Sequence, residues 1–152
     1  MQNPPPGQPS APTGQQSSLG MAPNLAAMLC YLGALAVHVI VGLIFFFVEK
    51  ENRFVRFHAM QSVLYVVACT AVMIVLAILN GIIAVVFSVA ASATNSGIIG
   101  MLVGLITMVI WLVIPLIYIG GLILGGIKAY QNTKFKFPII GNLAEKIASG
   151  GN

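Results

Sequence analysis

Few side chains in this sequence could carry out chemistry, and they lie far apart. His38 lies inside the first long apolar run, and Cys69 lies about equally deep in the second. A histidine–cysteine pair is a conceivable metal or redox site, but two ligands are too few for a closed zinc site. A neutral histidine that bonds a nearby hydroxyl or carbonyl group is the simpler interpretation. We therefore expect no metal and no cofactor.

The two cysteines show no spacing that is typical of a metal or redox motif. Cys30 and Cys69 are single residues in separate apolar runs, without a CxxC pair. A buried free cysteine usually behaves as a small hydrophobic residue. Because Cys30 should lie near the opposite membrane face from Cys69, we expect no disulfide between them.

Carboxylates are missing from most of the chain. From Asn52 to Ala144 there is no Asp or Glu. Proton-coupled transporters are marked by intramembrane acids, and acid–base catalysis needs carboxylates or comparable groups, so this gap argues against both. No GxSxG, HExxH, Walker or dinucleotide-binding motif is present. The sequence predicts a protein that is not an enzyme.

The densest charged segment is EKENRFVRFHAMQS, residues 49–62, which holds five of the ten charged residues. Arg53 and Arg56 are spaced i, i+3 and would share one helix face. They either anchor a helix end to anionic headgroups or form a docking surface for another protein. A second basic cluster follows Lys128. The candidate residues for lipid or partner contact are Arg53, Arg56, His58, Gln61, Lys134 and Lys136.

Composition places the chain in a bilayer. Of 152 residues, 59% are hydrophobic and 7% are charged, which leaves too little polar surface for a soluble domain of this size. The formal charge of +4 is small, and the basic residues are confined to two segments rather than spread over a face. We expect the lipid bilayer, and no nucleic acid, as a partner.

The first part of the chain is predicted to be a tail and one membrane span. Residues 1–23 hold six of the eight prolines and no charged side chain, a composition typical of disorder. The uncharged run from Leu25 to Val48 has 24 residues, where about 20 cross the hydrocarbon core. We therefore predict a span over about residues 24–48.

Two longer apolar runs follow. Residues 59–93 carry no charge and would form a helix too long for the bilayer core, so the helix either tilts and projects or breaks near Asn80-Gly81. We predict a span over 59–79 with an extension to 93. After a turn at SATNSG, residues 92–97, a third span over 98–127 contains Pro115, which should kink it. The candidate helix-packing residues are the GxxxG glycines Gly100, Gly104, Gly121 and Gly125.

The C-terminal segment turns polar after Lys128. Asn142 and Glu145 have capping-box spacing for a short helix from about Leu143 to Ala148. Its mixture of polar and apolar residues is typical of a helix that lies in the membrane interface. Residues 24–148 then form one helical membrane domain, and residues 149–152 form a flexible end.

Positive charge sets the expected topology. All seven basic residues lie in the two clusters, which places both clusters on the cytoplasmic side. Three spans satisfy this rule with the N-terminal tail outside and the C-terminus inside, whereas four equal spans would separate the clusters. We predict an all-α polytopic inner-membrane protein with three transmembrane helices, four being the alternative, and a cytoplasmic C-terminus.

The two charged segments also carry a family resemblance. Residues 49–62 and the segment KAYQNTKFKFPIIGNLAEKI, residues 128–147, resemble those of small uncharacterised bacterial membrane proteins of a domain-of-unknown-function family. That family is regarded as distantly similar to the twenty-kilodalton membrane subunit of the chloroplast inner-envelope protein-import translocon. The resemblance implies a non-enzymatic membrane component and lends no catalytic role. The matching residues are Arg53, Phe54, Arg56, Phe57, His58, Gln61, Lys136, Pro138, Gly141 and Glu145.

The sequence thus predicts a membrane subunit or oligomeric scaffold that acts through helix packing and a basic cytoplasmic face. Its partner would be a second copy or another membrane protein. The alternative is a component of a protein-import-like or small-solute channel or transporter, which would need a polar strip along one membrane helix. The residues available for such a strip are His38, Cys69, Thr70, Asn80 and Thr107.

Overall fold

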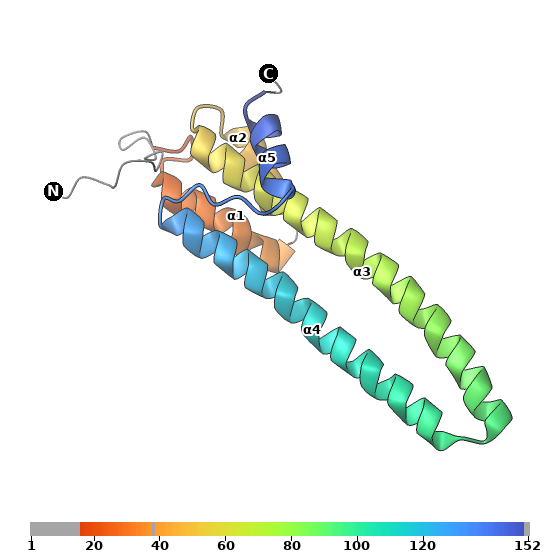
Figure 1. Ribbon diagram of the computed structural model, residues 1–152. Helices are drawn as coiled ribbons and strands as arrows, with labels where there is room; N and C mark the ends of the chain where they lie inside the picture. The colour runs from red at the N-terminus through yellow and green to blue at the C-terminus, as the bar shows by residue number, and fades with distance from the viewer. Residues whose placement is uncertain (1–15, 38, 151–152) are drawn as a thin grey trace. The chain divides into compact units, whose positions relative to one another are not determined.

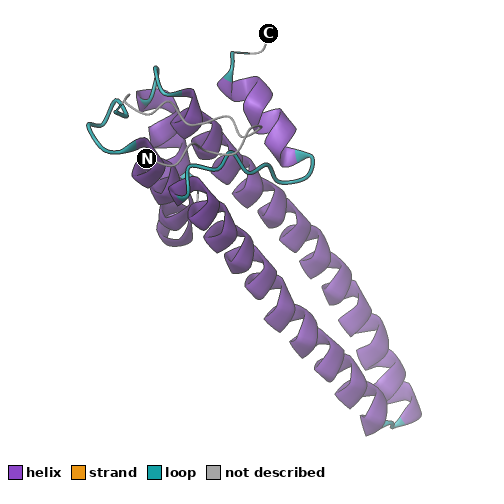
Figure 2. Cartoon of the chain, turned by 60° about the vertical axis from the view of Figure 1, so that its left-hand side comes forward, coloured by secondary structure: helices purple, strands orange, loops and turns teal. Residues whose placement is uncertain are grey.

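The computed structural model of the protein describes residues 16–37 and 39–150. These residues form helices and connecting loops without a strand, as Figure 2 shows. The prediction of an all-α fold is therefore confirmed. In chain order the helices are α1 (Pro23–Val37), α2 (Ile40–Val48), α3 (Arg53–Thr94), α4 (Gly97–Tyr130) and α5 (Ile140–Ala148) (Figure 1).

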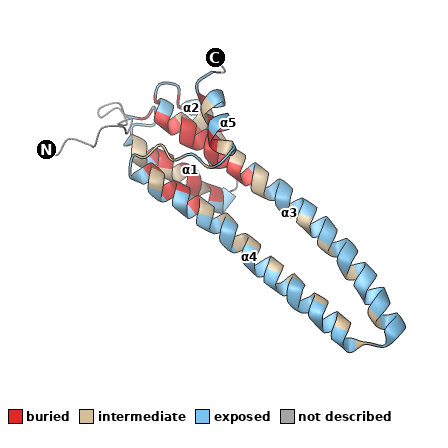
Figure 3. Cartoon of the chain, viewed as in Figure 1, coloured by how far each residue is buried: buried red, intermediate tan, exposed pale blue. Residues whose placement is uncertain are grey.

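The chain divides into two compact units. The first is formed by the residues up to Val67 together with those from Gly120 onward, and the second by Ala68–Ile119. Buried residues gather in the first unit, in α1, α2, the start of α3, the end of α4 and α5 (Figure 3). The second unit consists of the adjoining parts of α3 and α4, whose large apolar side chains are mostly exposed.

The first apolar run forms two helices instead of one. α1 has 15 residues and α2 has 9, and each is shorter than the about 20 residues needed to cross a bilayer core. The two helices pack on each other because Gly33 lets them approach closely. A Cβ atom at Gly33 would come within 2.5–2.7 Å of the Val41 side chain. His38 lies at the break, outside the described residues.

Within residues 16–37 and 39–150, two helices, α3 and α4, are long and apolar enough to cross a membrane. The prediction of three transmembrane helices is therefore not confirmed. α3 runs unbroken through Asn80-Gly81 for 42 residues, which is about 63 Å at 1.5 Å per residue. The helix tolerates Asn80 because its side chain amide donates a hydrogen bond to the Thr107 hydroxyl, at 3.2 Å. α4 continues on both sides of Pro115.

α3 begins at Arg53 because Asn52 caps it. The Asn52 side chain oxygen accepts hydrogen bonds from the backbone N–H groups of Phe54 and Val55, at 3.1 and 3.3 Å. Both N–H groups lie in the first helical turn, where no earlier carbonyl is available to them. At the other end, Asn95 turns the chain towards α4 with a φ of 49°, a left-handed conformation that asparagine tolerates.

α5 starts earlier than the sequence indicates. It begins at Ile140, and no side chain bond caps it at Ile139, so the expected capping box at Asn142 is not formed. A γ-turn precedes the helix instead. Ile139 has a φ of 65°, and the Ile140 N–H donates to the Pro138 carbonyl at 2.7 Å. A β-branched residue with positive φ is strained.

An Ile139→Gly variant is expected to be more stable than the wild type. Glycine adopts positive φ without steric cost, so the change should relieve about 1–3 kcal/mol of strain, against about 0.5–1 kcal/mol lost through the greater freedom of glycine when unfolded. The side chain is 86% exposed, so little packing is lost. Thermal unfolding in detergent measures the difference. Replacement of Leu143 by glycine should instead lower stability, because the backbone at Leu143 is helical.

Candidate functional site

A buried carboxylate joins the two ends of the α1–α2 segment. Glu49, 1% exposed, follows α2 and accepts hydrogen bonds from both the backbone N–H and the hydroxyl of Ser18, each at 2.7 Å. The same side chain accepts the backbone N–H groups of Glu51 and Asn52, at 3.3 and 3.0 Å. We call the contact the Ser18–Glu49 clasp. It fixes the residues before α1 beside the start of α3.

The clasp keeps Glu49 ionised. Burial opposes the charged form, but the hydrogen bonds from Asn52, Ser18 and Glu51 favour it more strongly and hold the pKa of Glu49 below its ordinary value of 4.5. A carboxyl group with a lowered pKa stabilises the fold fully above its unfolded-state pKa. That contribution is lost as the pH falls below 4.5 and through the lowered value.

A Glu49→Gln variant is expected to lose stability at neutral pH and to approach the wild type in acid. Hydrogen bonds to a charged group contribute about 1.5–3 kcal/mol, and an amide can accept with only one of its two terminal atoms. Thermal unfolding measured at a series of pH values gives the difference between the two proteins. Glu51→Gln, at an exposed neighbouring position, serves as the control. A difference that did not shrink in acid would contradict the assignment of a charged clasp.

A buried polar network links α1, α3 and the segment before α5. The Gln61 side chain amide donates to the Tyr31 hydroxyl at 2.8 Å and to the Phe135 carbonyl at 3.0 Å. The Tyr31 hydroxyl lies 3.1 Å from Nδ1 of His58. Since this hydroxyl accepts from Gln61, its own proton is available for His58. Nδ1 is then the acceptor, and the His58 proton is on Nε2.

Aromatic rings enclose His58. The rings of Phe54, Phe57 and Tyr31 lie edge-to-face with it, at centroid distances of 4.5, 5.0 and 5.8 Å. Tyr31, His58 and Gln61 are each 0% exposed. The network joins α1, α3 and the segment before α5 in one arrangement.

Two of the four basic residues of the C-terminal segment are paired with one carboxylate. Lys134 and Lys136 each approach a different oxygen of Glu145, both at 2.6 Å. Hydrogen bonds from Lys134 and then Lys136 lower the pKa of Glu145 to about 2. Lys134 also lies 5.1 Å from the centroid of the Phe57 ring, and Arg56 lies 5.0 Å from that of Phe46. These contacts fix the cations to the apolar core of the first unit.

A family model now adds to this geometry. Residues 22–144 match the model described as the magnetosome magnetite crystal formation protein family, MamF/MmsF. The match covers most of the chain. The chain belongs to this family.

Curated relatives of this MamF/MmsF member are membrane proteins of archaea. Two UPF0132 membrane proteins of Methanocaldococcus jannaschii are 33% and 32% identical to it, over 85% and 86% of this chain and 72% and 93% of their own lengths. A UPF0132 membrane protein of Archaeoglobus fulgidus is 32% identical, over 86% of this chain and 99% of its own length. No solved structure matches significantly. The chain is thus a membrane protein, as the sequence predicts.

The comparisons refine the resemblance seen in the sequence. The family is MamF/MmsF, and the relatives named above are archaeal, so a bacterial origin is not confirmed. The distant similarity to the chloroplast import subunit receives no support from them and stays a prediction. The matched region contains the whole of the first charged segment, residues 49–62, and most of the second.

The structure separates the predicted contact residues of this MamF/MmsF member into two groups. His58 and Gln61 lie in the buried network and not on a surface. Arg53 is exposed and Arg56 is half-buried, while Lys134 and Lys136 expose 33% and 39% of their side chains. Arg53 and part of Arg56 are thus accessible at the surface, and their contact with lipid or a partner stays a prediction, whereas His58 and Gln61 lie inside the fold.

The four GxxxG glycines also separate. A Cβ atom at Gly125 would lie 2.5–3.0 Å from the Tyr31 ring, and one at Gly121 would collide with the Tyr65 hydroxyl. Gly100 and Gly104 have nothing within 4 Å of such an atom. Gly121 and Gly125 therefore allow close packing inside the chain. Gly100 and Gly104 leave open space on α4, and their role in helix packing stays a prediction.

Sequence reasoning missed Ser18, Tyr31 and Glu49. Tyr31 is a polar aromatic residue in an otherwise apolar run, and this contrast was the available signal for it. In the sequence, Glu49 is recognisable only as part of the charged segment of residues 49–62. No spacing rule connects it with Ser18, since 31 residues separate the two. Asn52, three residues before Val55, was recognisable as a helix cap from its residue type.

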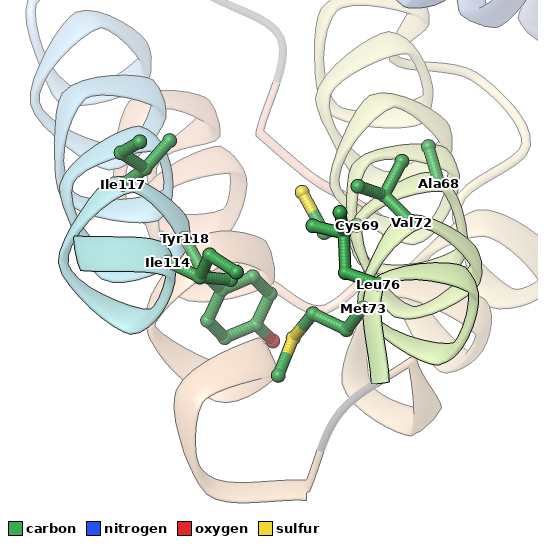
Figure 4. Close-up of a pocket in the computed structure, with 8 residues that line it drawn as sticks. All are labelled: Ala68, Cys69, Val72, Met73, Leu76, Ile114, Ile117 and Tyr118. Carbon is green, nitrogen blue, oxygen red and sulfur yellow. The ribbon is translucent and has the colours of Figure 1, made fainter. Parts of the chain in front are cut away.

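The second unit contains an apolar pocket of about 290 Å³ between its two helices (Figure 4). Cys69 and Met73 line it from α3, and Tyr118 lines it from α4. Both cysteines are free thiols. Among the described residues, no group of three or more His, Cys, Asp or Glu side chains could hold a metal ion.

Proposed function

We propose that this protein is a non-enzymatic membrane scaffold or subunit that crosses the inner membrane twice, with α3 and α4. In this proposal α1 and α2 form a re-entrant hairpin that enters and leaves at the cytoplasmic side. The Ser18–Glu49 clasp is the observation that carries it, because it joins the two ends of the hairpin. The Asn24 side chain amide supports it by donating to the carbonyl of Tyr130, at the end of α4, at 3.1 Å.

Charge supports the same topology. The two basic clusters flank the start of α3 and the end of α4, and both belong to the first unit. Two spans keep the clusters on one side and satisfy the positive-inside rule without moving the N-terminal tail across the membrane. The C-terminus is then cytoplasmic, as three spans also predict, but the N-terminal segment lies on the same side.

The scaffold role is supported by the polar side chains of both units, which form hydrogen bonds within the chain. In the first unit the buried polar side chains of Tyr31, His58 and Gln61 bond one another and the backbone. In the second unit Asn80 and Thr107 bond each other, which uses two of the residues that a polar channel strip would need. What the second unit offers its surroundings is apolar surface, suited to lipid or to other membrane helices.

The family description names magnetite crystal formation. That role is said of the family, and the scaffold proposal for this chain concerns membrane assembly alone.

Cysteine labelling tests the topology. In a cysteine-free background, Gln16, Asn95 and Gln131 are each replaced by cysteine in separate variants. Cells whose only barrier to the reagent is the membrane that holds the protein are then treated with a membrane-impermeant maleimide. We expect labelling at position 95 only, and labelling at 16 and 131 after lysis. Labelling at 16 from outside would restore three spans and overturn the re-entrant hairpin.

Crosslinking in native membranes tests the scaffold role. We expect a discrete crosslinked species that contains a second copy or a fixed membrane partner, identified by mass spectrometry. Recovery of the monomer alone would remove the subunit proposal. Solute flux into liposomes that contain the pure protein is the companion measurement, and a flux above that of empty liposomes would favour the channel alternative.

A further inference from the structure

α5 presents an apolar face that nothing in its own unit covers. Ile139, Leu143 and Ile147 are spaced by four residues and are 86%, 48% and 37% exposed. Leu143 and Ile147 lie within α5 at a spacing that puts them on one side of the helix, and Ile139 directly precedes the helix at its N-cap. We call them the α5 face. The helix already uses its other side for packing, where Ala144 and Ala148 are buried in a cluster with Phe57 and Met60.

The segment before α5 holds the most exposed of these residues in place. Ile139 is fixed by the γ-turn, with positive φ and the bond from Ile140 to Pro138. Gly141 then lies against the backbone of Lys136, where a Cβ atom would come within 2.5–3.1 Å of Lys136 atoms. A strained residue persists only when its surroundings fix it. The structure therefore maintains, at a cost in stability, an apolar side chain that points into the surroundings.

A cation accompanies the α5 face. Lys146 is exposed and adjacent to Ile147. Its ammonium group is complementary to a phosphate group above acyl chains. Arg56 is not part of this face, because it lies over Phe46, which packs on the opposite side of α5 with Ala144 and Ala148.

We propose that the α5 face binds the surface of an anionic bilayer, with Ile139, Leu143 and Ile147 among the acyl chains and Lys146 at the phosphates. A lipid surface is favoured over a protein because α5 packs on Phe57 and Met60 of α3, at the start of the uncharged run from Ala59 that enters the membrane. Amphipathic helices bury such a face about 5–10 Å into the interface. The proposal requires a membrane protein but not the scaffold role.

Fluorescence quenching in vesicles tests the proposal. The full chain carries Trp111→Phe to remove its only tryptophan, and Leu143→Trp as the probe. Asn142→Trp, exposed but off the α5 face, is the matched control. Both proteins are reconstituted in phosphatidylglycerol vesicles whose acyl chains are brominated. We expect severalfold stronger quenching at position 143 than at 142.

The same vesicles test whether binding of the α5 face depends on the negative charge of the lipid. Exchanging phosphatidylglycerol for brominated phosphatidylcholine should weaken quenching at 143, and Lys146→Gln should reduce that dependence on lipid charge. Equal quenching at 142 and 143 would overturn the proposal. So would a blue-shifted but unquenched probe at 143, which would show that protein, such as a second copy, covers the face. If Leu143→Trp lowers the helical content seen by circular dichroism, Ile147→Trp replaces it. Crosslinking and cysteine labelling test the scaffold role and the topology, and quenching tests the α5 face. The α5 proposal and the proposed function can therefore fail independently.

Discussion

A Gly125→Val variant is expected to be severely destabilised. Any side chain at this position meets the ring of Tyr31, which is fully buried. The ring cannot move away, because its hydroxyl is bonded to Gln61 and lies against His58. Overfilling a packed core costs about 1–3 kcal/mol and occasionally more, and here the polar network would be disturbed as well. Thermal unfolding in detergent, followed by circular dichroism, measures the loss.

Gly104→Val is the matched control for that experiment. Gly104 lies on the same helix and also belongs to a GxxxG spacing, but a side chain there meets nothing within 4 Å. Its unfolding should stay within about 0.5 kcal/mol of the wild type in detergent, as for surface substitutions in general. Equal losses at both positions would show that helix propensity, and not the contact with Tyr31, decides the outcome.

A Gln61→Leu variant is expected to show the second large loss. Leucine has a similar size but no amide, so the Phe135 carbonyl loses its hydrogen bond and the Tyr31 hydroxyl loses a donor. Each buried polar group left without a partner costs about 1–3 kcal/mol. The free energy of unfolding in detergent should therefore fall, and the segment around Phe135 should become accessible to protease.

Two comparisons isolate the network in that variant. Gln131→Leu changes the same residue type at an exposed site and should leave stability nearly unchanged. Tyr31→Phe alone removes the shared hydroxyl, and the double variant with Gln61→Leu should lose less than the sum of the single losses. Additive losses would mean that the two side chains do not act through their mutual bond.

Much of the architecture was predictable because hydropathy and charge are strong signals in a membrane protein. The apolar runs and the two charged segments indicated an all-helical chain with its basic residues at one boundary. The count of spans was not predictable in this way. Residues 25–48 are long enough to cross a bilayer, but this run forms two short helices, and the contacts of Gly33 with Val41 and of Ser18 with Glu49 support the proposed hairpin.

The buried network was less visible for a physical reason. His58 and Gln61 lie in a segment with two charged residues, Arg53 and Arg56, within nine residues of Gln61, and such a segment is typical of an exposed loop. Their burial depends on partners that are distant in sequence, 27 residues to Tyr31 and 74 residues to Phe135. Helical periodicity describes which residues share a face, but it does not identify what covers that face.

The unbroken course of α3 has a consequence for the lipids around it. Residues 59–93 are uncharged for about 52 Å of helix, against a hydrocarbon core of about 30 Å. Hydrophobic mismatch of this kind is relieved by tilting or by thickening of the adjacent bilayer, at fractions of a kcal/mol per Å. A thicker membrane reduces that penalty, so we expect the protein to partition towards sterol-like or long-chain lipid phases in mixed vesicles.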